Sequence, residues 1–266
     1  MNVFQAFVLG LVQGIGEFLP ISSSGFLILV PKLFGWQVQS LAFDAFLHIA
    51  TLTATIAALW PEVNIMLRAL FLSKKQDETS QQWRNLILWI VCAFIPVALF
   101  GLIFQHFIED YFRSEKTVAI SLIVWGIVLY IADRRANQKI DSVTRVGLSR
   151  AFIIGCAQVI ALIPGTSRSG ITITAGLFSG LSRESAARFS FLLAIPTVAA
   201  AGLFKLGDVI EGGAVIGWVP LVVGFLTATI SGFLTVRFLL QFLKRSTFSE
   251  FALFRIFIGV FILLLI

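Results

Sequence analysis

Charged residues are scarce in this chain. Only 13% of the 266 residues are Asp, Glu, Lys or Arg, whereas 58% are hydrophobic and the mean hydropathy is +0.95. Soluble domains contain about 25% charged residues, so this chain lacks the polar side chains needed to cover a surface that faces water. The composition therefore predicts a polytopic membrane protein, with residues 1–266 forming one integral membrane domain.

Cysteine and histidine are also rare, with two of each. Both cysteines, Cys92 and Cys156, lie in apolar runs, which favours small core residues over a disulfide. The chain has no Cys/His cluster with the spacing of a zinc site. Its first ten residues, MNVFQAFVLG, contain neither a Lys or Arg nor a cleavage site of small residues, which argues against a removable signal peptide.

The net charge of +6 comes from basic residues that gather in short loops between apolar stretches. Residues 68–84, 134–150 and 244–245 form three such loops, and the positive-inside rule predicts that all three are cytoplasmic. Connections of mixed or acidic character, near 109–116 and 208–217, are expected outside. This distribution indicates a membrane protein and excludes nucleic acid as a partner.

Six apolar stretches are long enough to cross a bilayer as helices, and they alternate in sidedness with these loops. With six spans and the basic loops in the cytoplasm, the C-terminus is predicted to lie outside. The stretches are residues 41–60, 85–106, 117–133, 186–207, 218–240 and 251–266.

Two further segments, residues 1–36 and 151–185, each contain an apolar arm, a polar Gly/Ser turn and a second apolar arm. The second arms, near 26–34 and 171–181, are much shorter than the roughly 20 residues that a spanning helix needs. We therefore expect two re-entrant helical hairpins, and with the six spans an all-α architecture.

The two hairpin segments resemble each other in sequence. AFVLGLVQ (6–13) matches AFIIGCAQ (151–158), and at the same offset SSSG (22–25) matches SRSG (167–170). A proline precedes each polar turn, although Pro20 and Pro164 are one position out of step. Small residues recur by chance in membrane helices, but the preserved order favours an internal repeat.

The loop charges give the two hairpins opposite directions of entry, which predicts an inverted-topology repeat with halves 1–133 and 151–266. Its polar turns should meet near the middle of the bilayer. Irregular backbone at that depth is tolerated only where it is buried in protein or lines a wet cavity. The chain is therefore predicted to form one polar pocket.

The second turn, PGTSRSGIT, has the composition of an anion site. Arg168 is costly at membrane depth unless it has a partner. Backbone N–H groups at a helix start, hydroxyls and a guanidinium together can bind an anion. The alternative is a capped helix end with a snorkelling arginine. The residues that would form the anion site with Arg168 are Gly165, Thr166, Ser167, Ser169, Gly170 and Thr172.

The first turn, QGIGEFLPISSSG, supplies a carboxylate. Gln13 and Glu17 are one helical turn apart and share a face, and Ser22, Ser23 and Ser24 follow. A serine beside a carboxylate and opposite an arginine has the nucleophile, base and charge clamp of phosphoryl transfer. A plain Glu17–Arg168 salt bridge with serines that cap a helix would fit the same residues, so the pattern alone leaves both interpretations open.

QGIGE and PGTSRSGIT together resemble the paired signature of the undecaprenyl-diphosphate phosphatase family, the bacitracin-resistance membrane phosphatases. The likeness covers essentially the whole chain, including FSFLLAIP (189–196) and FALFR (251–255). It implies that Ser23 is the nucleophile, Glu17 the essential acid and Arg168 the phosphate-binding residue. The other residues of the two motifs would bind substrate: Gln13, Ser22, Ser24, Gly165, Thr166, Ser167, Ser169, Gly170 and Thr172.

The resemblance also implies the reaction, which is removal of the terminal phosphate from a C55 polyprenyl diphosphate to regenerate the lipid carrier of cell-wall synthesis. It implies a bacterial cytoplasmic membrane location and a divalent cation, Mg²⁺ or Ca²⁺, for which Glu17 is the candidate ligand. The expected partners are a polyprenyl diphosphate lipid and the bilayer, with homodimerisation left open.

The chain departs from the family pattern at two positions. Phe26 stands where many relatives carry a histidine, and Arg188 stands where relatives often carry an acid. A pairing of Arg188 with Asp44 across the repeat is a hypothesis. Of the two histidines, His106 is expected at an outer interface and His48 in the core, with a place in the lining of the pocket as the alternative for His48.

Three alternative functions can be weighed against the residues of this sequence. A polyprenyl-phosphate flippase, or a catalytically weak paralogue, would use the same site for binding alone, since inverted repeats are common in transporters. The membrane lipid phosphatases that use a histidine separated by five residues from a Ser-Arg pair do not fit, because Thr174 occupies the place of that histidine. A purely structural membrane protein would leave Glu17 and Arg168 unexplained.

Overall fold

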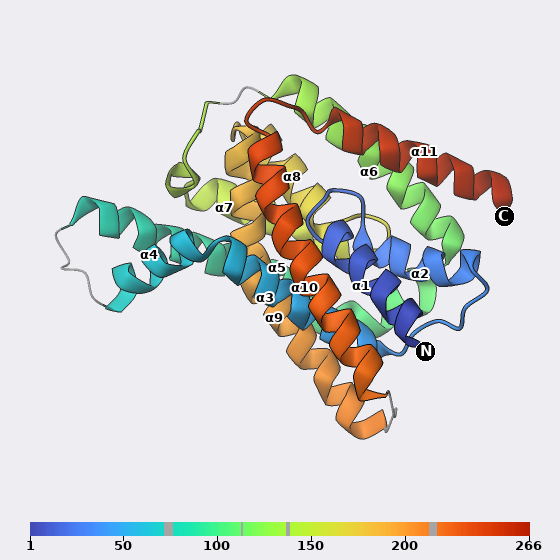
Figure 1. The fold of residues 1–266 in the computed structure, drawn as a ribbon. Coiled ribbons are helices and arrows are strands. Elements are labelled where there is room, and N and C mark those ends of the chain that lie inside the picture. The colour runs from blue at the N-terminus through green and yellow to red at the C-terminus, as the bar shows by residue number, and fades with distance from the viewer. Residues whose placement is uncertain (72–76, 113, 137–138, 213–216) are drawn as a thin grey trace.

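The computed structural model describes residues 1–71, 77–112, 114–136, 139–212 and 217–266. These residues fold into eleven α-helices and two short 3₁₀ helices, and they contain no β-sheet (Figure 1). The prediction of an all-helical chain is confirmed. The helices are α1 Val3–Gly16, α2 Ser23–Leu33, α3 Leu41–Ala58, α4 Trp60–Phe71, α5 Glu78–Phe112, α6 Glu115–Arg135, η1 Val143–Arg145, α7 Leu148–Gln158, η2 Val159–Leu162, α8 Arg168–Phe178, α9 Arg183–Gly212, α10 Trp218–Phe242 and α11 Ser249–Leu265.

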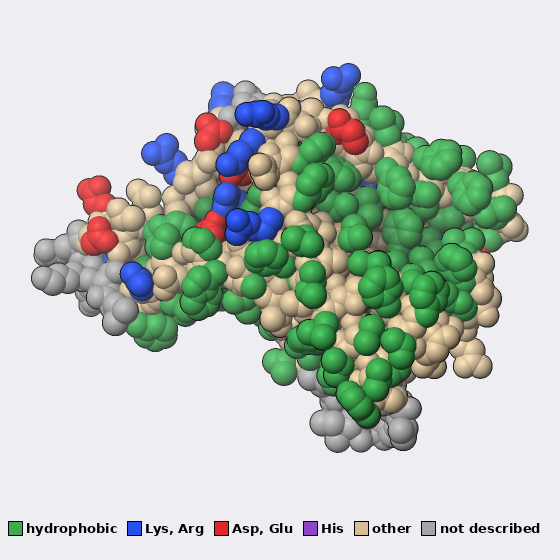
Figure 2. Space-filling view, in the orientation of Figure 1, with side chains coloured by type: hydrophobic (Ala, Val, Ile, Leu, Met, Phe, Trp, Pro, Cys, Tyr) green, Lys and Arg blue, Asp and Glu red, His purple; other side chains and the backbone are tan. Residues whose placement is uncertain are grey.

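Four of the described helices, α5, α6, α9 and α10, are long and apolar enough to cross a bilayer, which supports a multi-pass membrane protein. A fifth span results when α3 and α4 are counted together. The sixth expected span corresponds to α11, which has 17 residues. Hydrophobic side chains cover much of the visible surface, as expected where lipid replaces water as the solvent (Figure 2).

The chain bends by 79° where α3 ends and α4 begins. The cause is local, because Pro61 cannot donate a backbone hydrogen bond to the preceding turn and is tolerated only in the first turn of a helix. The bend directs α4 away from the helix bundle (Figure 1). It also brings Glu62, at the start of α4, into an ion pair with Arg188 of α9.

Glycine allows the first arm of each hairpin to pack closely on a long helix. On α1, a Cβ at Gly10 would lie 2.7 Å from the backbone oxygen of Gly224 in α10. On α7, a Cβ at Gly155 would lie 2.3 Å from the backbone oxygen of Ala93 in α5. Contacts of this kind are typical of membrane helices, which associate through close backbone approach. They fix α1 and α7 against the long helices.

The two hairpins share one local geometry. Their second arms, α2 and α8, each have 11 residues, about 16 Å of helix against a hydrocarbon core of about 30 Å. Each begins after a serine with positive φ, Ser22 at 78° and Ser167 at 73°, and these are the two non-glycine residues of the described chain with positive φ. Each serine Oγ accepts a hydrogen bond from the N–H of the glycine three residues on. The matching sequences therefore fold alike.

Several expectations require correction. Both cysteines are free, but Cys156 is exposed on the outer face of α7, where an apolar side chain can face lipid. The Asp44–Arg188 pairing is wrong. Arg188 pairs with Glu62 and Glu184. Asp44 lies near the start of α3, whereas Glu62 follows the end of that helix. At 1.5 Å per residue, the part of α3 between them is about 20 Å long.

The two connections expected outside, near 109–116 and 208–217, are shorter than predicted, because α5 continues to Phe112 and α9 to Gly212. Some predictions concern residues that the structure does not describe. Lys74, Lys75 and residues 213–216 are not among the described residues, and the side chain of His106 is likewise outside them.

Candidate active site

Glu17, at the C-terminal end of α1, lies at the centre of a buried polar cluster. Its Oε2 accepts hydrogen bonds from Ser23 Oγ at 2.7 Å and from Gln13 Nε2 at 3.1 Å. Its Oε1 accepts from Arg168 Nη2 at 3.0 Å. Glu17 is 7% exposed and Ser23 8%. The structure therefore brings together four of the predicted residues, from two motifs about 150 positions apart in the sequence.

The first turn places Ser23 on Glu17 by reversing the chain within a few residues. Helix α1 ends at Gly16, and the left-handed conformation of Ser22 starts α2 in a new direction at Ser23. The two segments approach so closely that a Cβ at Gly16 would lie 2.9 Å from Ser23 Cα. Glycine is required there because any side chain would push the serine away from the carboxylate.

Arg168 is the first residue of α8, the position that Ser23 occupies in α2. Besides its bond to Glu17, Arg168 donates from Nη1 to the backbone oxygen of Ser190 on α9 at 3.0 Å. Its buried Nε has no partner among the described residues. The guanidinium is thus fixed by two of its groups, and a third N–H is left to donate to an incoming oxygen.

The remaining hydroxyls of the second turn hold the site together. Thr172 donates to the backbone oxygen of Arg168 at 2.8 Å and lies 2.7 Å from the hydroxyl of Ser190. Ser169 donates to the backbone oxygen of Leu19 at 3.2 Å, which joins the second turn to the first. Thr166 is fully buried, and its Oγ1 has no partner in the described structure.

Other predicted residues are not directed at Glu17. Ser22 and Ser167 are helix N-caps whose hydroxyls accept backbone hydrogen bonds. Ser24 is exposed and bonds to Ser22 at 3.3 Å. Gly165 has φ of +88°, and Gly170 makes room for a side chain of α11, since a Cβ there would lie 2.9 Å from Arg255 Nη1. These residues shape the turns.

Arg255 of α11 is the functional residue that the sequence analysis missed. It is 0% exposed and donates to three backbone oxygens, those of Pro20 at 3.2 Å, Gly165 at 2.9 Å and Thr166 at 2.7 Å. One guanidinium therefore binds both polar turns. A charged residue inside the apolar run FALFRIFIG was the available signal. Ser190 gave no such signal.

The charge balance suits an anionic ligand. One carboxylate, Glu17, stands among two guanidinium groups, Arg168 and Arg255, so the cluster carries an excess positive charge. Buried charges of this kind are stable only when they are paired and hydrogen-bonded, and Arg255 has carbonyls for partners instead of a carboxylate. A phosphate group would supply the missing negative charge.

A divalent cation is compatible with these residues. In the described residues, no three His, Cys, Asp or Glu side chains are grouped so that they could hold a metal ion together. The Oε1 of Gln13, beside Glu17, is buried without a hydrogen-bond partner among the described residues. One carboxylate and one amide oxygen, completed by phosphate oxygens, are a donor set that Mg²⁺ accepts.

Phe26 stands where many relatives carry a histidine, and His48 is a histidine that this chain does contain. The Phe26 ring stacks on Phe254 of α11, with centroids 6.2 Å apart. His48 is half-buried in α3, and its Nδ1 is 2.7 Å from the backbone oxygen of Asp44, one turn earlier. The histidine thus has a backbone partner within its own helix.

Fold and site together define a helical multi-pass membrane protein in which two polar turns hold a carboxylate, a serine and an arginine in a buried cluster. The family model described as "Bacitracin resistance protein BacA" matches residues 6–261. The chain belongs to this family.

Relatives match over the whole chain. A protein of Pelotomaculum thermopropionicum named undecaprenyl-diphosphatase is 40% identical over 265 residues, covering 100% of this chain and 97% of the relative. Proteins of the same name from Moorella thermoacetica and Campylobacter curvus are 43% and 42% identical, covering 98% and 99% of this chain and 97% and 98% of the relatives.

Proposed function

We propose that this protein hydrolyses undecaprenyl diphosphate to undecaprenyl phosphate and inorganic phosphate, and so recycles the lipid carrier of cell-wall synthesis. Full-length relatives named undecaprenyl-diphosphatase support the reaction. The observation that carries the proposal is the hydrogen bond of 2.7 Å from Ser23 Oγ to Glu17 Oε2, in a carboxylate that is also paired with Arg168.

The chemistry follows from these contacts. Ser23 Oγ attacks the terminal phosphorus while Glu17 Oε2 accepts the hydroxyl proton, and the bond to the bridging oxygen breaks to release polyprenyl phosphate. The proton on Glu17 then passes to the departing polyprenyl phosphate, which leaves the carboxylate free again. Water attacks the phosphoserine, and Glu17 accepts a proton from the water and passes it to Ser23 Oγ as the Oγ–phosphorus bond breaks, which releases inorganic phosphate. Arg168 donates to the phosphoryl oxygens, where negative charge develops. Ser23 and Arg168 are both within hydrogen-bond distance of Glu17, so the side chains that these steps use are already in place.

A bound Mg²⁺ or Ca²⁺ would be held by Glu17 and Gln13 Oε1 and would neutralise charge on the diphosphate. The unpartnered Gln13 oxygen supports this assignment. Gln13 itself donates to Glu17 and so fixes the orientation of the carboxylate. The protein residues bind and orient the phosphate and move the proton.

We further propose the membrane architecture in which this site operates: six spans and two re-entrant hairpins in halves 1–133 and 151–266, inverted relative to each other, in the bacterial cytoplasmic membrane with the C-terminus outside. The shared geometry of Ser22 and Ser167 and the shortness of α2 and α8 support it. So does the contact of both turns with Arg255, because turns that meet in the protein interior can remain irregular at membrane depth.

Replacing Ser23 by alanine tests the proposed function. Purified protein in detergent with undecaprenyl diphosphate should release phosphate, and Ser23→Ala should lower the rate at least about a thousandfold, because no other group replaces the nucleophile. A colorimetric phosphate assay measures the rate. Binding of the lipid should persist in the variant, since Glu17 and Arg168 remain.

Thr53→Ala is the matched control, because Thr53 is an exposed hydroxyl of α3 that bonds only to the backbone of its own helix at Ile49. It should keep the full rate. If the unmodified protein binds the lipid without releasing phosphate above background, the hydrolase assignment is wrong and a polyprenyl-phosphate flippase that uses the same site becomes the better description.

Replacing Phe26 by histidine tests the departure from the family pattern. The Phe26 ring is occupied by stacking on Phe254, and Glu17 already bonds to Ser23, so a base is in place without a histidine. We expect turnover within about threefold of the unmodified protein, a difference below about 1 kcal/mol in the barrier. A gain above tenfold in the same phosphate assay would show that the phenylalanine limits catalysis.

A further inference from the structure

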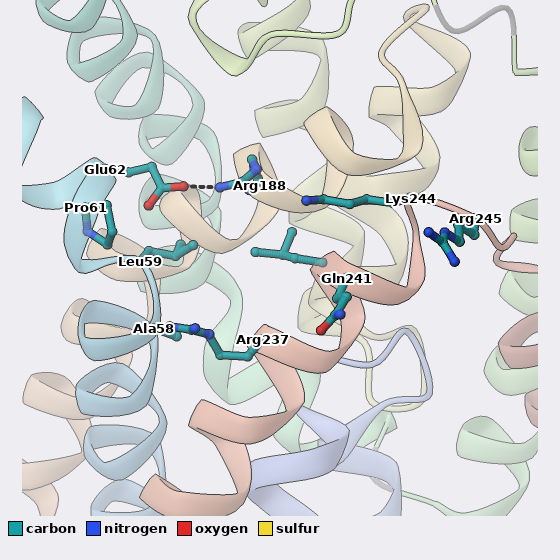
Figure 3. Close-up of a pocket in the computed structure, with 10 residues that line it drawn as sticks. Ala58, Leu59, Pro61, Glu62, Arg188, Arg237, Gln241, Lys244 and Arg245 are labelled. Atoms are coloured by element: carbon teal, nitrogen blue, oxygen red, sulfur yellow. Dashed lines mark hydrogen bonds and ion pairs between the residues drawn. The ribbon is translucent and has the colours of Figure 1, made fainter.

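A second polar cavity lies apart from the Glu17 cluster. It has a volume of about 670 Å³ and opens where the α3–α4 bend, the start of α9 and the end of α10 meet (Figure 3). Ligand pockets of proteins have volumes of about 300–1,000 Å³. Its lining residues are Ala58, Leu59, Pro61, Glu62, Arg188, Arg237, Leu240, Gln241, Lys244 and Arg245. No residue of the proposed catalytic cluster is among them.

The cavity is strongly basic. Four of its lining side chains are Lys or Arg and one is acidic. Arg188 is engaged by Glu62 and by Glu184, one turn earlier, and Figure 3 shows the Glu62–Arg188 pair on one side of the cavity. The side chains of Lys244 and Arg245 have no hydrogen bond or ion pair in the described part of the chain. In Figure 3 the Arg245 side chain extends away from the other basic groups, so an anion in the cavity would pair with Lys244.

The basic groups approach the cavity from more than one direction. In Figure 3 the Lys244 side chain extends toward Arg188, and the Arg237 side chain extends from α10 toward Ala58 on α3. Arg237 also lies over the Phe233 ring, 5.7 Å from its centroid, which restricts its guanidinium. Converging donors of this kind suit a phosphate group, whose oxygens accept several hydrogen bonds at once.

The other wall of the cavity is apolar. Ala58, Leu59, Pro61 and Leu240 form it, and exposed hydrophobic residues continue along α10 at Leu234 and Phe238. Lys and Arg side chains gather at the upper end of α10, next to this apolar surface (Figure 2). A basic pocket beside a lipid-facing helix surface fits an anionic lipid, whose headgroup would enter the pocket while its chains remain on the helix.

The cavity and the Glu17 cluster share no lining residue, and both adjoin the same apolar core. Phe18, directly after Glu17, packs edge-on against Phe191 with centroids 5.5 Å apart, and both are fully buried. Leu59 and Leu240 of the cavity wall belong to the same apolar core. The cavity is therefore a site of its own.

We propose that this cavity binds the phosphate headgroup of a lipid, as a second site distinct from the one at Glu17. The ligand group is a phosphate with a terminal negative charge, and its source is either a lipid headgroup or free inorganic phosphate. The apolar wall favours the lipid. The inference does not depend on the proposed hydrolysis.

The test uses the full-length protein purified in a neutral detergent, with dihexanoyl phosphatidic acid and inorganic phosphate as separate probes in isothermal titration calorimetry. We expect saturable binding of the lipid probe, at least tenfold tighter than that of inorganic phosphate. Arg237→Gln combined with Lys244→Gln should weaken lipid binding about tenfold or more. Arg168→Ala should leave this binding in place, which separates the cavity from the catalytic cluster.

Arg134→Gln combined with Lys139→Gln is the matched control, because Arg134 is likewise an exposed arginine over an aromatic ring, that of Tyr130 at 5.6 Å. The control should bind the lipid as the unmodified protein does. Equal weakening in both double variants would show nonspecific attraction to positive charge and overturn the proposal. Inorganic phosphate that binds as tightly as the lipid would overturn the assignment to a lipid. The melting temperature of each variant confirms that it is folded.

Discussion

Replacing Glu17 by glutamine is expected to lower turnover of undecaprenyl diphosphate by about a thousandfold or more. The amide keeps the shape of the side chain but cannot accept the proton of Ser23 Oγ, and general base catalysis contributes about 10²–10⁴-fold. The carboxylate contacts three of the predicted residues, Ser23, Gln13 and Arg168. Steady-state phosphate release in detergent measures the loss as a change in kcat.

Glu250→Gln is the control for this substitution, because Glu250 is an exposed carboxylate at the start of α11 that bonds to Thr247. It should stay within about twofold of the unmodified protein, as surface changes of this kind have small effects. A melting curve identifies any loss of fold in Glu17→Gln. If Glu17→Gln is folded and keeps more than a tenth of the turnover, the carboxylate is not the base that activates Ser23.

Replacing Arg255 by lysine should damage both stability and catalysis. Lysine keeps the charge but lacks the planar fork that reaches three carbonyls. At least one of the oxygens of Pro20, Gly165 and Thr166 would lose its partner, and each buried acceptor left unpaired costs about 1–3 kcal/mol. The melting temperature should fall by about 10 °C.

The effect on catalysis follows from the position of Arg255 between the two turns. A loosened contact would let Ser23 and Arg168 move apart, and a displacement of about 1 Å can cost about 100-fold in rate. We expect kcat to fall about 100-fold, with a smaller change in KM, at a temperature where the variant is folded. Arg255 would then be a positioning residue for the catalytic cluster.

Arg150→Lys is the control for Arg255→Lys. Arg150 also donates to backbone oxygens, those of Ser179 at 3.1 Å and Val146 at 3.3 Å, but it is exposed, so water can replace the lost hydrogen bonds. It should keep its melting temperature within about 2 °C, as most surface substitutions do. If Arg255→Lys lowers the melting temperature but leaves kcat unchanged, Arg255 stabilises the fold without positioning the site.

The sequence predicted the core of the site because its signals are local and chemically unusual. A carboxylate, a serine run and an arginine stand out in apolar surroundings, and an unpaired charge is costly there. The matched strings around Ser22 and Ser167 also predicted two similar turns, which the structure has. The contact of Glu17 with Arg168 follows from those two observations together.

The directions in which helices leave a bend, and the contacts that result, could not be predicted in this way. The bend at Pro61 turns α4 aside, and it decides that Arg188 meets Glu62 and not Asp44. Periodicity and charge count do not reveal such a bend. Ser24 is exposed because successive residues of a helix lie about 100° apart around its axis, so Ser24 does not share the face of α2 from which Ser23 reaches Glu17.

Arg255 shows a different limit. It lies 235 positions from Pro20, and its side-chain hydrogen bonds in the described structure go to backbone oxygens, so no side-chain partner in the sequence indicates its role. The lone charge in an apolar helix was visible, but its purpose depends on a three-dimensional arrangement in which both turns present their carbonyls to one helix.

The central claim is that two polar turns bring the Glu17–Ser23 pair and Arg168 together around one phosphate. A structure of the purified protein with orthovanadate, which mimics a phosphoryl group in transfer, tests it most directly. We expect vanadate bonded to Ser23 Oγ, with Arg168 donating to its oxygens and Glu17 beside the serine. Vanadate bound elsewhere, with the Glu17–Arg168 pair unchanged and Ser23 free of it, would contradict the account.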